Sequence, residues 1–156
     1  MKKLLSILAI LGFIMGTQVF ASDRDEAQAF FKSYVNAANT YSATLPNFYS
    51  PNAKIIREVV KPDGTLVDLD TDTNTYITQM KLGQATAKMR KYKNTYRNVV
   101  ISPVAGGFKI SAERQPTGET YWLKFYQIIK KQPNGKWLIT EEMMQTKVQI
   151  FLKYAK

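Results

Sequence analysis

The chain has 156 residues, of which 22 are Lys or Arg and 12 are Asp or Glu, so its formal net charge is +10. It contains neither cysteine nor histidine, which excludes a disulfide-stabilised fold, histidine-based catalytic triads and histidine-rich metal sites. The sequence therefore predicts no metal or other cofactor, while its basic balance either favours anionic partners or serves solubility alone.

The first 21 residues have the order of a secretory signal peptide. Two lysines precede an apolar run over residues 4–15, and small or permissive residues lead to Ala21, where cleavage is expected. The run ends before it reaches the ~20 residues of a membrane-spanning helix, so a retained anchor is the less favoured alternative. We predict export to the periplasm or the medium and one mature domain, residues 22–156, with a net charge of +8.

The N-terminal half of this domain combines helical and extended patterns. Residues 22–25 resemble a capping box, and the apolar residues that follow recur at helical spacing. The elements predicted here are a helix over residues 23–40, a short helical turn within 45–51, strands over 53–60 and 65–69, and a second helix that Thr73 or Asn74 caps and Gly83 ends or kinks.

The C-terminal half has the period-two pattern of antiparallel strands joined in sequence. Asn134-Gly135 predicts a two-residue hairpin turn that pairs Pro133 with Lys136. The predicted strands lie near residues 96–104, 108–114 and 119–131, and a last strand begins at Lys136.

Two motifs stand at the start and the end of the predicted sheet. Residues 48–53, Phe-Tyr-Ser-Pro-Asn-Ala, lead into the first strand, and residues 134–139, Asn-Gly-Lys-Trp-Leu-Ile, lead into the last. In these motifs and in the order of its elements the chain resembles the cone-shaped superfamily of nuclear transport factor 2, SnoaL and ketosteroid isomerase, although Asn52 stands where the family usually has aspartate.

This resemblance covers nearly the whole mature chain. It implies an α+β fold in which N-terminal helices pack on a strongly curved antiparallel sheet, with a pocket at the open end of the cone. It also implies a homodimer formed through the outer face of the sheet. Function does not follow from it, because the same fold carries both enzymes and binding proteins.

Two adjacent glutamates, Glu141 and Glu142, interrupt the apolar last strand and must point to opposite faces of the sheet. The predicted turn places Glu141 opposite Ile128, with Lys130 as a diagonal partner for a half-exposed ion pair. It places Glu142 opposite Gln127 on an apolar face, where loss of water would raise its pKa. A bulge in the last strand would exchange the two faces.

Glu142 is therefore the candidate catalytic residue, acting with a tyrosine as ketosteroid isomerase does. The alternative is a structural carboxylate bound to glutamine or water. Leu138 is expected to share its face. The predicted ligand pocket comprises Tyr34, Tyr49, Tyr76, Tyr121, Phe125, Gln127 and Met144.

A second candidate site is a run of cations that tyrosines interrupt. It is a predicted patch for contact with an anionic surface, made of Lys88, Arg90, Lys91, Lys93 and Arg97. The alternative is the solvated end of a helix that enters an edge strand, where lysine discourages aggregation. Specific nucleic-acid binding is not expected of an exported protein.

We expect the protein to bind a small hydrophobic or anionic ligand, or an envelope protein, in its pocket without catalysis. One alternative is a pocket enzyme of the lyase or isomerase type that uses Glu and Tyr as acid and base. The other is an assembly or accessory protein of the envelope.

Overall fold

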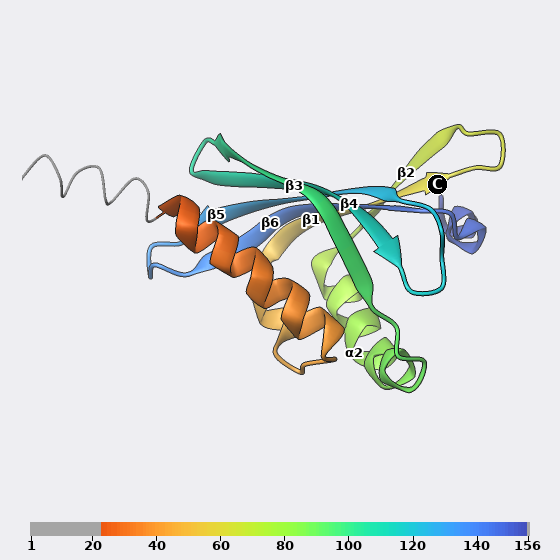
Figure 1. Cartoon of the computed structure of the whole chain (residues 1–156), viewed down its shortest axis with the longest axis horizontal. Helices are drawn as coiled ribbons and strands as arrows, with labels where there is room; N and C mark the ends of the chain where they lie inside the picture. The colour runs from red at the N-terminus through yellow and green to blue at the C-terminus, as the bar shows by residue number, and fades with distance from the viewer. Residues whose placement is uncertain (1–22, 156) are drawn as a thin grey trace, which may run out of the picture.

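The described part of this computed structural model is residues 23–155. The leader predicted over residues 1–21 therefore lies outside the described residues. Within residues 23–155 no helix has both the length and the apolar composition to span a membrane. The N-terminal helix and α2 (Thr73–Met89) lie on the same side of one six-stranded sheet (Figure 1).

The N-terminal helix runs over residues 23–39 and confirms the predicted helix. Ala27, Phe31 and Tyr34 recur at spacings of four and three, so they share one face, and this face is buried. A 3-10 turn, η1 (Leu45–Phe48), follows within the predicted broken segment, with a proline in its first turn.

The sheet has the strand order β2-β1-β6-β5-β4-β3. Its strands are β1 (Tyr49–Val60), β2 (Leu66–Thr71), β3 (Asn94–Val104), β4 (Gly107–Pro116), β5 (Leu123–Lys131) and β6 (Trp137–Thr146). The α+β class is confirmed, but the sheet is mixed and not wholly antiparallel as predicted, because β1 and β6 pair in parallel. Short hairpins make their two strands antiparallel, whereas β1 and β6 are joined through the whole intervening chain and are free of that constraint.

Helix α2 is capped one residue earlier than predicted. The Asp72 carboxylate accepts from the Thr75 N–H at 2.9 Å, while the Thr73 hydroxyl is buried and donates to the Ala53 carbonyl oxygen at 2.7 Å. Gly83 does not end the helix, which continues for six residues to Met89. Thr73 therefore ties the first turn of α2 to β1.

The hairpin between β5 and β6 differs from the predicted two-residue turn. The Gln132 N–H donates to the Lys136 carbonyl oxygen at 2.7 Å, so residues 133–135 form a three-residue turn. This shifts the pairing by one residue, and a bulge at Thr140 shifts it back. Both glutamates therefore keep their predicted partners on β5, although the turn was predicted wrongly.

The bulge also changes which apolar residue shares the face of Glu142. Ile139 pairs with Ile129 and is fully buried. Leu138, which was predicted on that face, pairs with Lys130 and is only half-buried. The bulge thus moves Ile139 to the inner face while Glu142 stays there.

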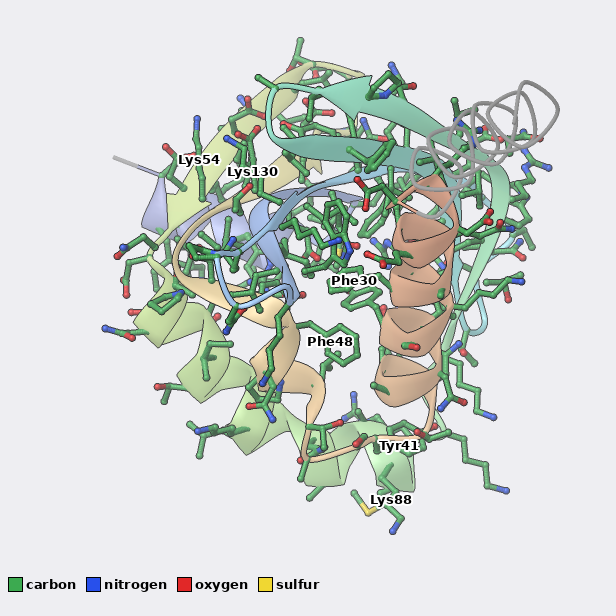
Figure 2. The ribbon with its side chains drawn as sticks, turned by 90° about the vertical axis from the view of Figure 1, so that its left-hand side faces the viewer. Phe30, Tyr41, Phe48, Lys54, Lys88 and Lys130 are labelled. Atoms are coloured by element: carbon green, nitrogen blue, oxygen red, sulfur yellow. The ribbon has the colours of Figure 1, made fainter. Side chains whose placement is uncertain are left out.

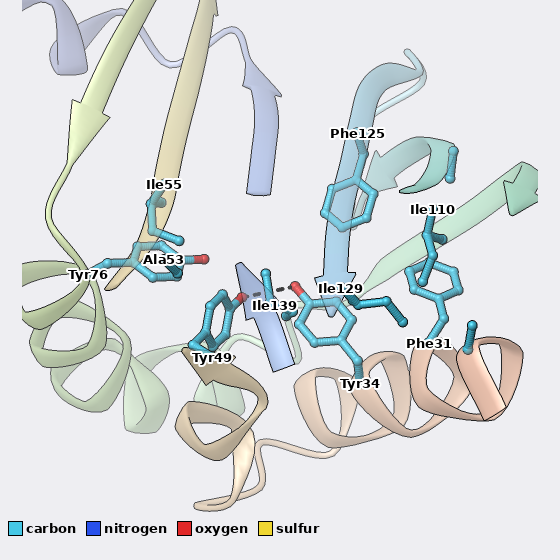
Figure 3. Close-up of a cluster of buried hydrophobic side chains, with 12 residues drawn as sticks. Phe31, Tyr34, Tyr49, Ala53, Ile55, Tyr76, Ile110, Phe125, Ile129 and Ile139 are labelled. Atoms are coloured by element: carbon cyan, nitrogen blue, oxygen red, sulfur yellow. Dashed lines mark hydrogen bonds between the residues drawn. The ribbon is translucent and has the colours of Figure 1, made fainter. Parts of the chain in front are cut away.

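The hydrophobic core lies between the inner face of the sheet and the two helices. Phe30 of the N-terminal helix and Phe48 of η1 point toward one another, with ring centroids 5.3 Å apart (Figure 2). The buried core cluster comprises Ala27, Phe31, Tyr34, Tyr49, Ala53, Ile55, Tyr76, Ile110, Ala112, Phe125, Ile129 and Ile139 (Figure 3). Three tyrosines in this list place polar atoms inside an otherwise apolar core.

Candidate functional site

Glu142 lies on the inner face of β6 and is 1% exposed. Its carboxylate accepts three hydrogen bonds, from Gln127 Nε2 at 2.7 Å, from the Tyr49 hydroxyl at 2.9 Å and from the Tyr76 hydroxyl at 3.1 Å. The Tyr34 and Tyr49 hydroxyl oxygens are 3.5 Å apart, which links a third tyrosine to the group. We call Glu142, Gln127 and these three tyrosines the Tyr-Glu cluster.

Each member of the Tyr-Glu cluster comes from a different element. Glu142 pairs with Gln127 across β5 and β6, and Tyr49 opens β1 directly after the proline-containing turn η1. Tyr76 lies in the first turn of α2, which Asp72 caps. Figure 3 shows the hydroxyls of Tyr34 and Tyr76 directed toward that of Tyr49. Five separate segments must pack correctly before the site exists.

Burial dominates the electrostatics of the Tyr-Glu cluster. It raises the pKa of Glu142, while hydrogen bonds from Gln127, Tyr49 and Tyr76 oppose the rise by stabilising the charged form. Burial also raises the pKa of Tyr34, Tyr49 and Tyr76, and the negative charge of Glu142 is the second largest cause of the rise in each. The tyrosines therefore remain protonated at ordinary pH and serve as donors to the carboxylate.

A cavity of about 460 Å³ lies beside the Tyr-Glu cluster, between the N-terminal helix, η1 and α2. Tyr34, Tyr49, Tyr76 and Met144 line it, but Glu142 does not. The carboxylate therefore lies behind the tyrosines, and the cavity presents phenol groups in its place. We call this space the tyrosine cavity.

Most of the predicted pocket residues meet at this site. Phe125 is buried behind the tyrosines, where its ring centroid is 6.4 Å from that of Tyr34, and Gln127 contacts Glu142 directly. Tyr121 is not part of the site. It lies in the connection before β5, which starts four residues later than predicted, and its ring sits 4.3 Å from Lys147 Nζ.

Most of the residues that line the tyrosine cavity were missed in the sequence, among them Arg57 and Tyr41. Arg57 lies on the inner face of β1, and its alternation with Ile55 and Val59 could have indicated this position. Tyr41 lies in the turn after the N-terminal helix with φ 58°, and its hydroxyl is buried with no hydrogen-bond partner among the described residues. No sequence signal marks Tyr41, because its conformation depends on the turn that follows the helix.

Glu141 differs from its neighbour as predicted, but with another partner. Its carboxylate accepts from the Tyr126 hydroxyl at 2.6 Å, and the half-buried pair lies on the outer face. The ion pairs of residues 23–155 do not include the predicted one with Lys130. Tyr126, the diagonal neighbour on the other side of Ile128, takes the place of the predicted lysine.

All five residues of the predicted cationic patch are exposed, and four of them lie around the end of α2: Lys88, Arg90, Lys91 and Lys93. Arg97, its fifth member, is engaged elsewhere. Its Nε donates to Glu113 at 2.9 Å, and its guanidinium lies 4.0 Å from the centre of the Trp122 ring. Arg97 is therefore less available to an outside anion than the other four residues.

No protein-family model matches the chain, and no curated protein matches it by sequence. Among solved structures, an NTF2-like protein with a cystatin-like fold from Novosphingobium aromaticivorans is 8% identical, with a TM-score of 0.63 over 85% of this chain and 86% of that one. A DUF3225-family protein from Pectobacterium atrosepticum is 22% identical, with a TM-score of 0.57 over 79% and 89%. An NTF2-like protein from Cytophaga hutchinsonii is 13% identical, with a TM-score of 0.53 over 78% and 95%. The chain therefore has a nuclear transport factor 2-like fold, as the order of its elements predicts.

Proposed function

We propose that this protein binds a small, largely apolar ligand in the tyrosine cavity and does not transform it. The observation that carries the proposal is the position of Glu142, whose carboxylate lies behind the tyrosines and outside the cavity lining. No Asp or Glu is among the described residues that line this space. A bound ligand would meet phenols, methionines and aliphatic groups, together with Arg57, Lys81 and several side-chain amides.

Acid–base catalysis requires a group within hydrogen-bond reach of the proton that it transfers, roughly 2.6–3.2 Å between heavy atoms. The carboxylate of Glu142 already accepts three hydrogen bonds inside the protein. The hydroxyl protons of Tyr49 and Tyr76 are directed to that carboxylate and away from a ligand. Binding without chemistry is therefore the function that this geometry supports best.

The alternative function is a lyase or isomerase that uses the Tyr-Glu cluster. It is favoured by one observation, because burial that raises the pKa of a carboxyl group beside tyrosines is also how enzymes prepare a general base. It requires Glu142 to move into the tyrosine cavity when a substrate binds.

The proposal is tested with N-phenyl-1-naphthylamine, a neutral apolar dye whose fluorescence rises on leaving water. Ala38 lines the tyrosine cavity, and Ala29 lies exposed on the same helix. Ala38→Phe fills part of the space, so it should weaken dye binding at least tenfold, whereas Ala29→Phe should leave the affinity unchanged. Equal affinities in the two variants, or no binding by the folded wild type, would contradict the proposal.

The catalytic alternative has a separate test. In D₂O, an enzyme that removes a proton beside a carbonyl would exchange deuterium into enolisable ketones, and Glu142→Gln would abolish that exchange. We expect no exchange above the rate without protein. Exchange that depends on Glu142 would make the protein an enzyme.

We also propose that the protein is exported, because residues 1–21 have the pattern of a secretory signal peptide. Intact-mass measurement of the protein from its native host should find a chain that begins after Ala21. A mass that still includes residues 1–21 would argue instead for a retained anchor.

A further inference from the structure

We propose that the ligand of the tyrosine cavity is an amphipathic organic anion, whose carboxylate binds Arg57 and whose apolar body lies along α2. This inference rests on the proposed function and names the chemical class of its ligand. It is supported by the surroundings of Arg57 and by the charge of the cavity lining.

Arg57 is a half-buried cation at the wall of two cavities. It pairs with Leu69 on β2 and Met144 on β6, and it lines both the tyrosine cavity and a neighbouring space of about 470 Å³. Its guanidinium lies 5.7 Å from the centre of the Tyr76 ring and 4.3 Å from that of Phe151, in the C-terminal turn η2 (Gln149–Tyr154). Two aromatic rings therefore hold it in place.

This guanidinium has no carboxylate partner among residues 23–155. Asp70 and Asp72 line the neighbouring cavity, but neither forms an ion pair with it, and Asp72 is occupied in capping α2. Contacts with ring faces leave the N–H donors in the guanidinium plane free, and their fork geometry fits a carboxylate. A half-buried arginine that is fixed by aromatic rings is a ready anion site.

The lining of the tyrosine cavity is positively charged. In the described part of the chain it includes Arg57 and Lys81 but no Asp or Glu. The carboxylate of Glu142 lies nearby but is covered by its three hydrogen-bond donors. The positive charge of the lining favours an anion over a cation.

The rest of the lining is suited to an apolar body. Along α2, Tyr76 lines the cavity beside Arg57, and Gln84 and Ala87 line it further along the helix. Tyr76 and Gln84 are eight positions apart, or about 12 Å along the helix axis. The apolar residues that line the cavity include Ala38, Leu45, Pro46, Met80, Ala87 and Met144. A chain or ring system of that length, with a carboxylate at one end, fits both the shape and the charge.

The test displaces N-phenyl-1-naphthylamine from the protein with decanoate, 1-decanol or decylamine at pH 8. The three competitors share one alkyl chain and differ in the charge of the head group. We expect decanoate to bind at least tenfold more tightly than decanol, and decylamine to bind most weakly. Equal affinities of decanoate and decanol for the wild type would overturn the inference.

Two variants locate the preference. Arg57→Gln should bring decanoate to the affinity of decanol, and Arg57→Met should do the same. The affinity of each variant for the dye is measured first, so that decanoate and decanol are compared within one variant. Lys54→Gln, on the same strand but exposed to solvent, should keep the preference. A preference that survives in a folded Arg57 variant would overturn the role of Arg57. Failure of the neutral dye to bind the wild type would instead remove the proposed function itself.

Discussion

Replacing Tyr49 by phenylalanine tests whether the Tyr-Glu cluster holds an ionised carboxylate. The substitution keeps the ring and removes the hydroxyl that donates to Glu142 at 2.9 Å. A hydrogen bond to a charged group contributes about 1.5–3 kcal/mol, and one between neutral groups about 0.5–1.5 kcal/mol. Tyr49→Phe should therefore lower the free energy of unfolding by about 1.5–3 kcal/mol when Glu142 is ionised and by about 0.5–1.5 kcal/mol when it is protonated.

The sign of the pH dependence follows from the pKa of Glu142. The Tyr49 hydrogen bond lowers that pKa, so Tyr49→Phe raises it further above the value in the unfolded chain. A carboxyl with a raised pKa contributes full stability below its unfolded pKa, and this contribution is lost as the pH rises through the folded pKa. The variant should therefore lose more free energy of unfolding at pH 8 than at pH 4.5, by about 1 kcal/mol.

Urea unfolding at the two pH values measures this difference, and Tyr126→Phe is the matched control. Tyr126 donates to Glu141, the adjacent glutamate, but their half-buried pair lies on the outer face. Its removal should cost less than about 1 kcal/mol at both pH values, because water can replace the hydroxyl. Equal costs for the two variants at both pH values would refute the reasoning.

Two further predictions concern stability. Glu142→Gln removes the titrating group, so the wild type should lose stability relative to this variant by about 1.4 kcal/mol per pH unit as the pH rises from the unfolded to the folded pKa of Glu142. Urea midpoints in steps from pH 4 to 8 measure it, and parallel profiles would contradict the raised pKa. Gly107→Ala should lower the free energy of unfolding by about 1–3 kcal/mol or more, because the added Cβ would lie 1.9 Å from the Ile129 carbonyl oxygen. Gly83→Ala, in an open helical position, should instead stabilise the protein by about 0.5–1 kcal/mol in thermal unfolding, and the opposite order would show that these two environments are misassigned.

The elements of the fold could be predicted because their signals are local. The N-terminal helix shows its buried face at spacings of three and four residues, and strands of the meander show alternation between turns. The parallel pairing of β1 with β6 could not be derived in this way, since it joins segments about 90 residues apart and no turn records it. It also brings Tyr49 next to Ile139, and so decides which phenol reaches Glu142.

The site was predictable only where cross-strand pairing determines it. Glu142 and Gln127 face each other as predicted, because the Thr140 bulge offsets the longer turn. The tyrosines were candidates by composition alone, and the one wrong candidate, Tyr121, sits where the start of β5 was misplaced. Arg57 was missed because a charged residue in a strand is usually taken to face water, whereas the rings of Tyr76 and Phe151 cover it here.

The correct placement of Glu142 depends on two deviations that cancel, and this makes a last prediction. The three-residue turn displaces β6 by one position, and the Thr140 bulge restores it, so only the residues between turn and bulge change faces. Ile139 lies in the core, so Ile139→Ala should lower the free energy of unfolding by about 2–5 kcal/mol. Leu138 is only half-buried, so Leu138→Ala should lower it clearly less. A regular ladder with a two-residue turn would give the opposite order. Urea unfolding of the two variants therefore tests for the bulge. A larger loss of unfolding free energy for Leu138→Ala would mean that β6 has no bulge at Thr140 and that other residues form the inner face beside Glu142.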